Sequence, residues 1–461
     1  MGESVTFLRK RTLVSTKPVQ PPCKIHQLSA LDLMMEKHHL NIIHYYNTPL
    51  GLQLGELSTK IRDNLSETLS YFPVVMGRLT KDNINNDMGK WVIKCNDAGL
   101  RFVEAKAKGS VEEWLENLDD EKENMLVHWE DMCHVPYHWS TFYIKVTEFE
   151  EGGLALGLSC AHMITDSVCA TLFLKAVTDI LVNGRVSVPP FFHSLPRNNN
   201  NNRLLLLNLE KSHQNPNNYL INTYKSYLES PSPLTAKHYK TIALEFKDDM
   251  VQSCMNLAQL NGPTNDAYSP ACIALIGLLW NCISRVKGMR HGLIDMSICS
   301  NMRKILGLDQ GFFGNCMIYN KVYGNGTRVD DLMSSIKAIK DAIENVNKDD
   351  ILELIEWLEH YNRDHSSSFV VDGDKLEFIN LEDMDPYSNI FTQGYEPIRV
   401  SYYSESGVEK DKVLILPWRP NEGQLSKIVM ITLPSDEVIK LCEDQHLTRY
   451  SPLILMDPKH K

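Results

Sequence analysis

The stretch GLALGLSCAHMITDSVCATLFL, residues 153–174, sets a histidine between two apolar runs. The small and apolar residues before His162 predict a buried strand. The residues after Asp166 place apolar side chains on one face at helical spacing, which predicts a helix capped by Thr165 or Asp166. His162 is therefore expected at a strand-to-helix turn that is fixed from both sides, a place suited to a general base.

The spacing of His162 and Asp166 is by itself a weak sign of catalysis. The chain has 16 histidines, so about one H-x-x-x-D match is expected by chance. A second copy stands at His360 and Asp364 and is interpreted as a polar helix end. The alternative for the first copy is that His162 is an ordinary core histidine and Asp166 only a helix cap. The local sequence leaves both interpretations open.

Length and charge narrow the class of protein. The 461 residues exceed what one hydrophobic core usually supports, which predicts two domains. The net charge of −11 argues against nucleic acid and against an anionic membrane surface as the main partner. The longest apolar run, 271–283, is shorter than the roughly 20 residues of a transmembrane helix. The sequence therefore predicts no membrane span.

Cysteine and histidine usage argues against a metal site. The 11 cysteines form no C-x-x-C pair, and histidines do not cluster with them at ligand spacing. Several cysteines lie inside apolar runs, where a free thiol behaves as a small hydrophobic group. We therefore expect no bound metal and a reducing, cytoplasmic location.

Strand and helix patterns alternate in both halves of the chain, which predicts an α/β fold. Helices are expected over 57–72 and 110–118, a strand hairpin over 140–160 with its turn at EEGG, and one long helix near 331–361.

A low-complexity segment, PRNNNNNRLLLLN at 196–208, separates the two halves. Consecutive asparagines bury too little apolar surface to form a core, so the segment is interpreted as a link. The expected division is an N-terminal domain at 1–195 that contains HMITD, a crossover linker at 196–235, and a C-terminal domain at 236–461.

Five segments, taken in order, give the chain a family resemblance. They are HQLSALDL (26–33), YFPVVMGRL (71–79), HMITD (162–166), SPACIALIGLLWNCISRVKG (269–288) and GFFGNC (311–316). In this order and approximate spacing they resemble the plant BAHD acyltransferases.

That resemblance implies two chloramphenicol-acetyltransferase-like domains with mixed sheets, joined by a crossover loop and enclosing a central solvent channel. It implies acyl-CoA as substrate or ligand, and no permanently bound cofactor. His162 would be the catalytic base, and Asp166 would turn away from the channel and hold the loop. Arg303 in SNMRK would pair with Asp166. GFFGNC is interpreted as a turn between strands and is assigned no chemistry.

The chain departs from the family at its second hallmark, D-F-G-W-G. The matching segment reads NIFTQGYEP (389–397), with Ile390, Thr392 and Gln393 in place of the Asp, the first Gly and the Trp. Three other segments, CNDAGLRFVEAKAKGSVEEWLE (95–116), LVHWEDM (126–132) and EPIRVSYY (396–403), resemble the eceriferum wax proteins of the same superfamily.

The subgroup resemblance implies a function without acyl transfer. Such a protein assists a 3-ketoacyl-CoA synthase, the condensing enzyme of the endoplasmic-reticulum elongase, in extending very-long-chain acyl-CoA. The chain would then associate with the endoplasmic reticulum through this partner. The alternative is a soluble CoA-dependent O- or N-acyltransferase with His162 as general base, because HMITD is complete.

Overall fold

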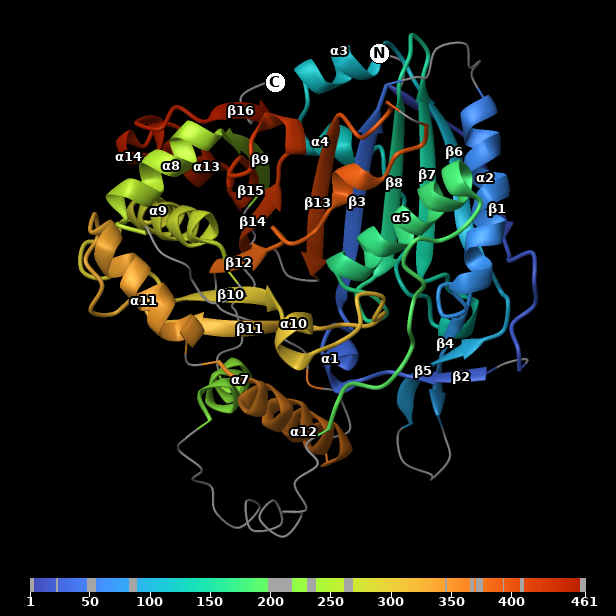
Figure 1. The fold of residues 1–461 in the computed structure, drawn as a ribbon, viewed down its shortest axis with the longest axis horizontal. Helices are drawn as coiled ribbons and strands as arrows, with labels where there is room; N and C mark the ends of the chain where they lie inside the picture. The colour runs from blue at the N-terminus through green and yellow to red at the C-terminus, as the bar shows by residue number, and fades with distance from the viewer. Residues whose placement is uncertain are drawn as a thin grey trace.

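Two open β-sheets with helices packed against them form the body of the molecule (Figure 1). This computed structural model describes residues 4–21, 24–47, 55–82, 89–197, 218–229, 238–260, 268–344, 346–364, 369, 376–392, 394–406 and 410–456. Both sheets mix parallel and antiparallel pairs, and neither closes into a barrel. The predicted α/β fold with mixed sheets is confirmed.

The first sheet has six strands in the order β1-β6-β7-β8-β3-β13. Their bounds are Val5–Leu13, Leu100–Ala107, Phe142–Phe149, Leu154–Ala161, His38–Tyr46 and Arg399–Ser406. Only β6 and β7 pair in parallel. Helices α2 (Glu56–Thr68) and α5 (Ser167–Asn183) pack together on one face of this sheet.

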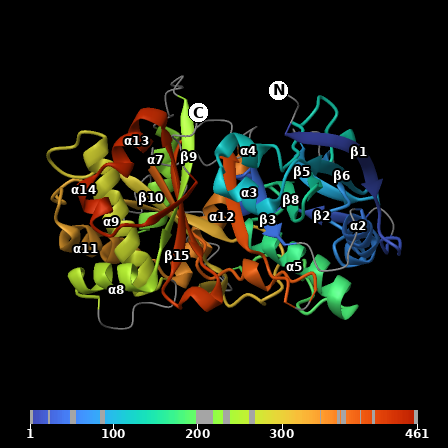
Figure 2. The ribbon, with the colours of Figure 1, turned by 90° about the horizontal axis from the view of Figure 1, so that it is seen from above.

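The second sheet has seven strands in the order β11-β10-β12-β14-β15-β9-β16. Their bounds are Met317–Val322, Met296–Asn301, Leu376–Asn380, Asp411–Pro417, Lys427–Pro434, Tyr239–Phe246 and Leu453–Met456. Helices cover its outer face (Figure 2): α8 (Asp248–Leu257), α9 (Pro270–Val286), α11 (Leu332–Glu344), α13 (Ser435–Cys442) and α14 (Gln445–Thr448).

The remaining elements lie around these two sheets. A small sheet joins β2 (Lys24–Gln27), β5 (Lys90–Cys95) and β4 (Arg78–Asp82). The other helices are α1 (Ala30–Leu33), α3 (Val111–Glu116), α4 (Asp120–Asn124), α7 (Tyr219–Glu229), α10 (Arg303–Leu306) and α12 (Lys348–Asp364). Short 3₁₀ turns occupy Leu69–Tyr71, Pro136–His138, Pro386–Ser388 and Pro420–Glu422.

Strand β13 comes from the second half of the sequence but completes the sheet of the first half. It pairs antiparallel with β3, from Arg399 opposite Tyr45 to Ser406 opposite His38. The buried carboxylate of Glu123 on α4 accepts hydrogen bonds from Tyr45 on β3 and Ser401 on β13. The two halves are therefore joined by backbone and side-chain hydrogen bonds as well as by the chain.

Most of the expected elements form where the patterns place them. Ser110 caps α3 in a reciprocal capping box with Glu113. The hairpin over 140–160 is confirmed as β7 and β8, and Gly152 and Gly153 in its turn take positive φ values of 117° and 105°. Only glycine adopts such values without strain.

The prediction of one long helix near 331–361 is wrong, because two helices, α11 and α12, occupy this region. Asn347 lies just before α12, and its side-chain oxygen accepts hydrogen bonds from the backbone N–H groups of Asp349 and Asp350. An asparagine in this position caps a new helix.

The expected linker, 196–235, falls mainly outside the described residues. Within it the structure describes 196–197 and 218–229, and the latter range contains α7, which packs against α12 (Figure 1). The domain boundaries stay predictions.

Candidate functional site

The HMITD turn lies at the end of β8, the most deeply buried strand of the first sheet. All eight residues of β8 are buried. Gly157 in its middle has no room for a side chain, because a Cβ atom there would lie 2.2 Å from the backbone oxygen of Leu126. This close approach requires glycine at position 157.

His162 is held by backbone hydrogen bonds from both sides. Its N–H donates to the carbonyl of His38 on β3 (2.9 Å), and its own carbonyl accepts from Thr165 (3.3 Å). The side chain is only 5% exposed. The predicted strand-to-helix turn is confirmed.

Asp166 begins α5 and forms a buried ion pair with Arg303. Its Oδ1 accepts from the N–H of Cys169 (3.0 Å), which makes Asp166, not Thr165, the helix cap. Arg303 Nη1 lies 2.8 Å from Asp166 Oδ2, and the Cys316 N–H donates to the same oxygen (3.0 Å). Burial alone would raise the pKa of Asp166, but the Arg303 charge and these hydrogen bonds outweigh it and lower the pKa. The predicted Asp166–Arg303 pair is confirmed.

Asn315 joins three of the segments that carry the family resemblance. Its side-chain amide donates to the carbonyl of His162 (2.7 Å) and to Asp32 Oδ1 (2.8 Å). Asp32 itself belongs to a capping box with Ser29 at the start of α1. GFFGNC therefore holds the HMITD turn in place, a role that sequence reasoning missed. The only sign of this role in the sequence was that GFFGNC is one of the five ordered segments shared with the family.

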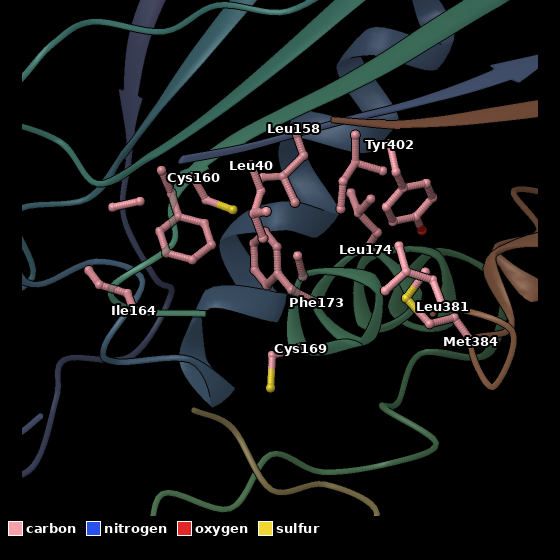
Figure 3. Close-up of a cluster of buried hydrophobic side chains, with 14 of the residues drawn as sticks. Leu40, Leu158, Cys160, Ile164, Cys169, Phe173, Leu174, Leu381, Met384 and Tyr402 are labelled. Atoms are coloured by element: carbon pink, nitrogen blue, oxygen red, sulfur yellow. The ribbon is translucent and has the colours of Figure 1, made fainter. Parts of the chain in front are cut away.

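The side chains of α5 anchor the turn in the core beneath the first sheet (Figure 3). Phe173 and Leu174 on α5 lie among Leu40 of β3 and Leu158 of β8. Cys169 points away from this cluster, and its thiol donates to the carbonyl of Phe312 (3.2 Å). One face of α5 thus packs on the sheet, while its first turn packs on the GFFGNC segment.

A second histidine, His38, lies beside His162 and was also missed. The two rings meet edge to face, with centroids 6.3 Å apart. The next residue, His39, stacks on Trp129 (4.4 Å), on the opposite face of β3 as strand alternation requires. Within the described part of the chain, Nδ1 of His38 and Nδ1 of His162 are both buried without a hydrogen-bond partner.

Both histidines are kept neutral at neutral pH. Burial lowers the pKa of His162, and the nearby charge of Lys412 adds to this, although Asp166 and Asn315 act in the opposite direction. Burial, and then the neighbouring His162 and Lys412, hold the pKa of His38 well below its ordinary value. A neutral imidazole is the form that accepts a proton.

A polar cavity of about 130 Å³ lies in the seam between the two sheets, close to the histidines. Lys412 of β14, Lys410 just before this strand and Glu405 of β13 line it. In the register of the first sheet, Glu405 lies opposite His39, and His39 lies opposite Ala161, the residue before His162. Lys412 donates to the carbonyl of Ser404, and Lys410 to Glu377 (3.3 Å). The seam therefore offers polar and cationic groups next to the motif.

The segment that replaces D-F-G-W-G packs tightly against β3. Phe391 is buried with its ring 4.3 Å from that of Tyr46, and the Tyr46 hydroxyl donates to the carbonyl of Asn389 (3.0 Å). Gly394 takes a positive φ of 85°. Gln393 lies outside the described residues.

The second H-x-x-x-D copy lies elsewhere, on α12, where His360 is exposed. No group of three or more histidine, cysteine or acidic side chains able to hold a metal occurs within the described ranges. No helix in the described part of the chain is both long enough and apolar enough to span a membrane.

Comparisons with known proteins agree with this architecture. The model of the Transferase family matches residues 3–448. Protein ECERIFERUM 26-like from Arabidopsis thaliana is 26% identical over 90% of this chain and 89% of its own length. The crystal structure of vinorine synthase is 18% identical and superposes with a TM-score of 0.67 over 95% of this chain and 96% of that one. TRI101 of F. sporotrichioides, complexed with coenzyme A and T-2, is 14% identical with a TM-score of 0.72 over 93% and 99%. These structural likenesses are of fold.

Proposed function

The chain belongs to the Transferase family of BAHD-type proteins, and from this premise we propose that it acts in cuticular wax biosynthesis. In this proposal it promotes elongation of very-long-chain fatty acyl-CoA together with a 3-ketoacyl-CoA synthase, the condensing enzyme of the endoplasmic-reticulum elongase. The observation that carries the proposal is the similarity to an eceriferum protein over 90% of the chain. The altered segment around Ile390 and Thr392 supports it, because this segment departs from the acyltransferase pattern.

The seam between the sheets is the proposed place for the acyl-CoA. A solved structure of similar fold is complexed with coenzyme A, and the seam cavity here is lined by Lys410 and Lys412. Asp120 and Glu405 also line the cavity, and Lys410 is paired with Glu377, so the likeness to the coenzyme A complex, and not the charge of the lining, supports this placement. The condensing enzyme brings the chain to the cytoplasmic side of the endoplasmic reticulum.

Two measurements test this proposal. The first is co-purification of the chain with a very-long-chain condensing enzyme expressed in the same yeast cells. The second is the acyl chain length that these cells produce. We expect association and longer products than the condensing enzyme makes alone. Absence of both association and lengthening would refute the accessory role.

A second function, acyl transfer from CoA to a hydroxyl or amine, is favoured by the complete motif geometry. In such a reaction the neutral imidazole of His162 takes the acceptor's proton while the acceptor oxygen or nitrogen bonds to the thioester carbonyl carbon. The carbon–sulfur bond then breaks, and His162 returns the proton to the CoA thiolate. Asp166 would act only on structure, because its carboxylate is occupied by Arg303.

The acyltransferase alternative has its own test. His162→Ala should reduce any measured transfer rate by about 10²–10⁴, the usual contribution of a general base. An unchanged rate in this variant would exclude the reaction scheme, and purified protein that transfers no acyl group at all would leave the accessory role as the better account.

A further inference from the structure

The HMITD motif does not itself contain a side chain that orients the imidazole of His162. A histidine that acts as a base usually has a third group that holds its ring in place. Asp166 does not supply this group, because its carboxylate is occupied by Arg303 and by the cap of α5. A side chain that does bond to His162 is that of Asn315, in the loop between α10 and β11 (Figure 1).

Asn315 is held in one position by Asp32. Oδ1 of Asp32 accepts from the backbone N–H of Asn315 and from its side-chain amide, both at 2.8 Å. Asp32 is fixed in turn by Ser29, whose N–H and hydroxyl both donate to its other oxygen at 2.7 Å. Asn315 is also fully buried. These bonds leave its amide group little freedom to turn.

The same amide group determines its own orientation beside His162. Its Nδ2 donates both to Asp32 Oδ1 and to the backbone carbonyl of His162 (2.7 Å). Both partners are acceptor oxygens, so the amide must present its nitrogen to them and not its oxygen. Oδ1 of Asn315 therefore points the other way. Among the described residues, this oxygen is buried and accepts no hydrogen bond.

The buried ring nitrogen of His162 lies on the side of its own backbone. A histidine ring reaches its own carbonyl only through Nδ1, and Nδ1 of His162 is buried. Burial lowers the pKa of His162, but its own backbone carbonyl and the side chain of Asn315 are among the groups that act to raise it. A hydrogen-bonding group that raises the pKa of a histidine accepts an N–H of the ring. A lone pair on Nδ1 would instead face these acceptors.

We propose that Asn315 is the positioning residue of His162. It anchors the backbone carbonyl of the turn and keeps the imidazole proton on the buried Nδ1. The lone pair then lies on Nε2, the ring nitrogen that an entering molecule can reach. The use of Nε2 as a base rests on acyl transfer, the second function proposed above, but the position of the proton does not.

NMR of the full chain, labelled with carbon-13 and nitrogen-15 in its histidines, tests this assignment at pH 7. The Cδ2 shift of a neutral imidazole reports which nitrogen carries the proton, and His162→Gln identifies the His162 resonance. We expect the proton on Nδ1 in the wild type. Asn315→Ala removes an acceptor and the anchor of the carbonyl, so it should move the Cδ2 shift toward that of the Nε2–H form.

Asn320→Ala is the matched control. Asn320 lies on β11, is buried like Asn315, and also donates to a backbone carbonyl at 2.7 Å, that of Ala342. Its substitution removes a buried hydrogen bond of the same kind and should leave the His162 resonance unchanged. Thermal unfolding of both variants shows how much stability each loses. If Asn315→Ala does not fold, Asn315→Ser, which keeps a smaller donor, takes its place in the same measurement.

A second readout applies where acyl transfer is measurable. Asn315→Ala should then lower kcat by about 10–100-fold and leave KM unchanged, because a misplaced base affects the transition state and not substrate binding. Asn320→Ala should leave both constants as in the wild type.

Three NMR results would overturn the proposal. They are a wild-type His162 with its proton on Nε2, an unchanged resonance in Asn315→Ala, and an equal shift in Asn320→Ala. Absence of any acyl transfer would remove only the second function, because the tautomer of His162 is measured without substrate.

Discussion

Asp166 is fully buried, and both of its carboxylate oxygens are used, one by the cap of α5 and both by Arg303. Asp166→Ala leaves the guanidinium buried without its counter-charge, which typically costs about 3–5 kcal/mol. We therefore expect a large fall in the urea midpoint of unfolding. Asp63→Ala, which removes an exposed carboxylate paired with Arg62, should cost less than about 1 kcal/mol. Equal midpoints for the two variants would contradict the structural role of Asp166.

Stability should fall in acid because buried histidines resist protonation. Burial lowers the pKa of His44 to about 3, against 6.5 for the free side chain. The unfolded chain therefore binds the proton first, and stability is lost as the pH falls below about 6.5. For His44 alone the loss at pH 5 is about 2 kcal/mol, at roughly 1.4 kcal/mol per pH unit.

His44→Asn should reduce the difference in urea midpoint between pH 7 and pH 5. The matched control is His360→Asn on the exposed face of α12, which should leave that difference as in the wild type. The same pH difference in His44→Asn and the wild type would show that His44 does not contribute.

At the residue scale, the structure of the HMITD motif itself could be predicted from the sequence. The turn and a cap at Thr165 or Asp166 follow from local pattern, and the pairing of Asp166 with Arg303 follows from family resemblance; the structure decides the cap for Asp166. The contacts of His38 and Asn315 with His162 could not be predicted in this way. Strand pairing brings His38 to His162, and Asn315 lies 153 residues from His162 in the sequence. No local pattern reports such contacts.

At the scale of the elements, strand β8 requires glycine at position 157. Gly157→Ala would place a methyl group 2.2 Å from the backbone oxygen of Leu126, in the turn after α4. The strand or the turn would have to move to accommodate it. We expect a loss of roughly 1–3 kcal/mol, as for other overpacked sites. Gly277→Ala on α9 is the comparison, because its Cβ would meet side chains alone, those of Ile336 at 3.0 Å and Leu332 at 3.3 Å. Thermal unfolding that ranks Gly277→Ala as the more harmful change would contradict this packing.

Elements with strong periodicity were predictable, and the break between α11 and α12 was not. Apolar residues recur at helical spacing on both sides of Asn347, so the pattern reads as one long helix. The new helix begins here because the side chain of Asn347 caps it by accepting from the N–H groups of Asp349 and Asp350. Asparagine also occurs inside helices, so its presence alone does not predict this break.

For the whole molecule, β13 predicts that the two halves stay together without a covalent link. Its eight residues pair with β3, and Ser401 and Tyr403 both donate to Glu123 of the first half. A protease site inserted after residue 205 should therefore yield two fragments that co-elute in gel filtration after cleavage. Fragments that separate in native buffer would contradict this account of the seam.

The fold class could be predicted from sequence because two α/β halves and five ordered segments pointed to one architecture. The exchange of β13 between the halves could not. The sequence at 399–406 predicts a strand and which residues share each of its faces. It does not predict the partner strand, which is set by the packing of the whole chain.

The central claim is that this chain lengthens acyl products through a partner and not by acyl transfer at His162. The most direct measurement is the acyl chain length in yeast that express a very-long-chain condensing enzyme with the wild type or with His162→Ala. The account predicts that both versions lengthen the products equally, with both proteins present at equal levels. Lengthening by the wild type alone would contradict it and assign His162 a chemical role. Lengthening by neither would favour the acyltransferase.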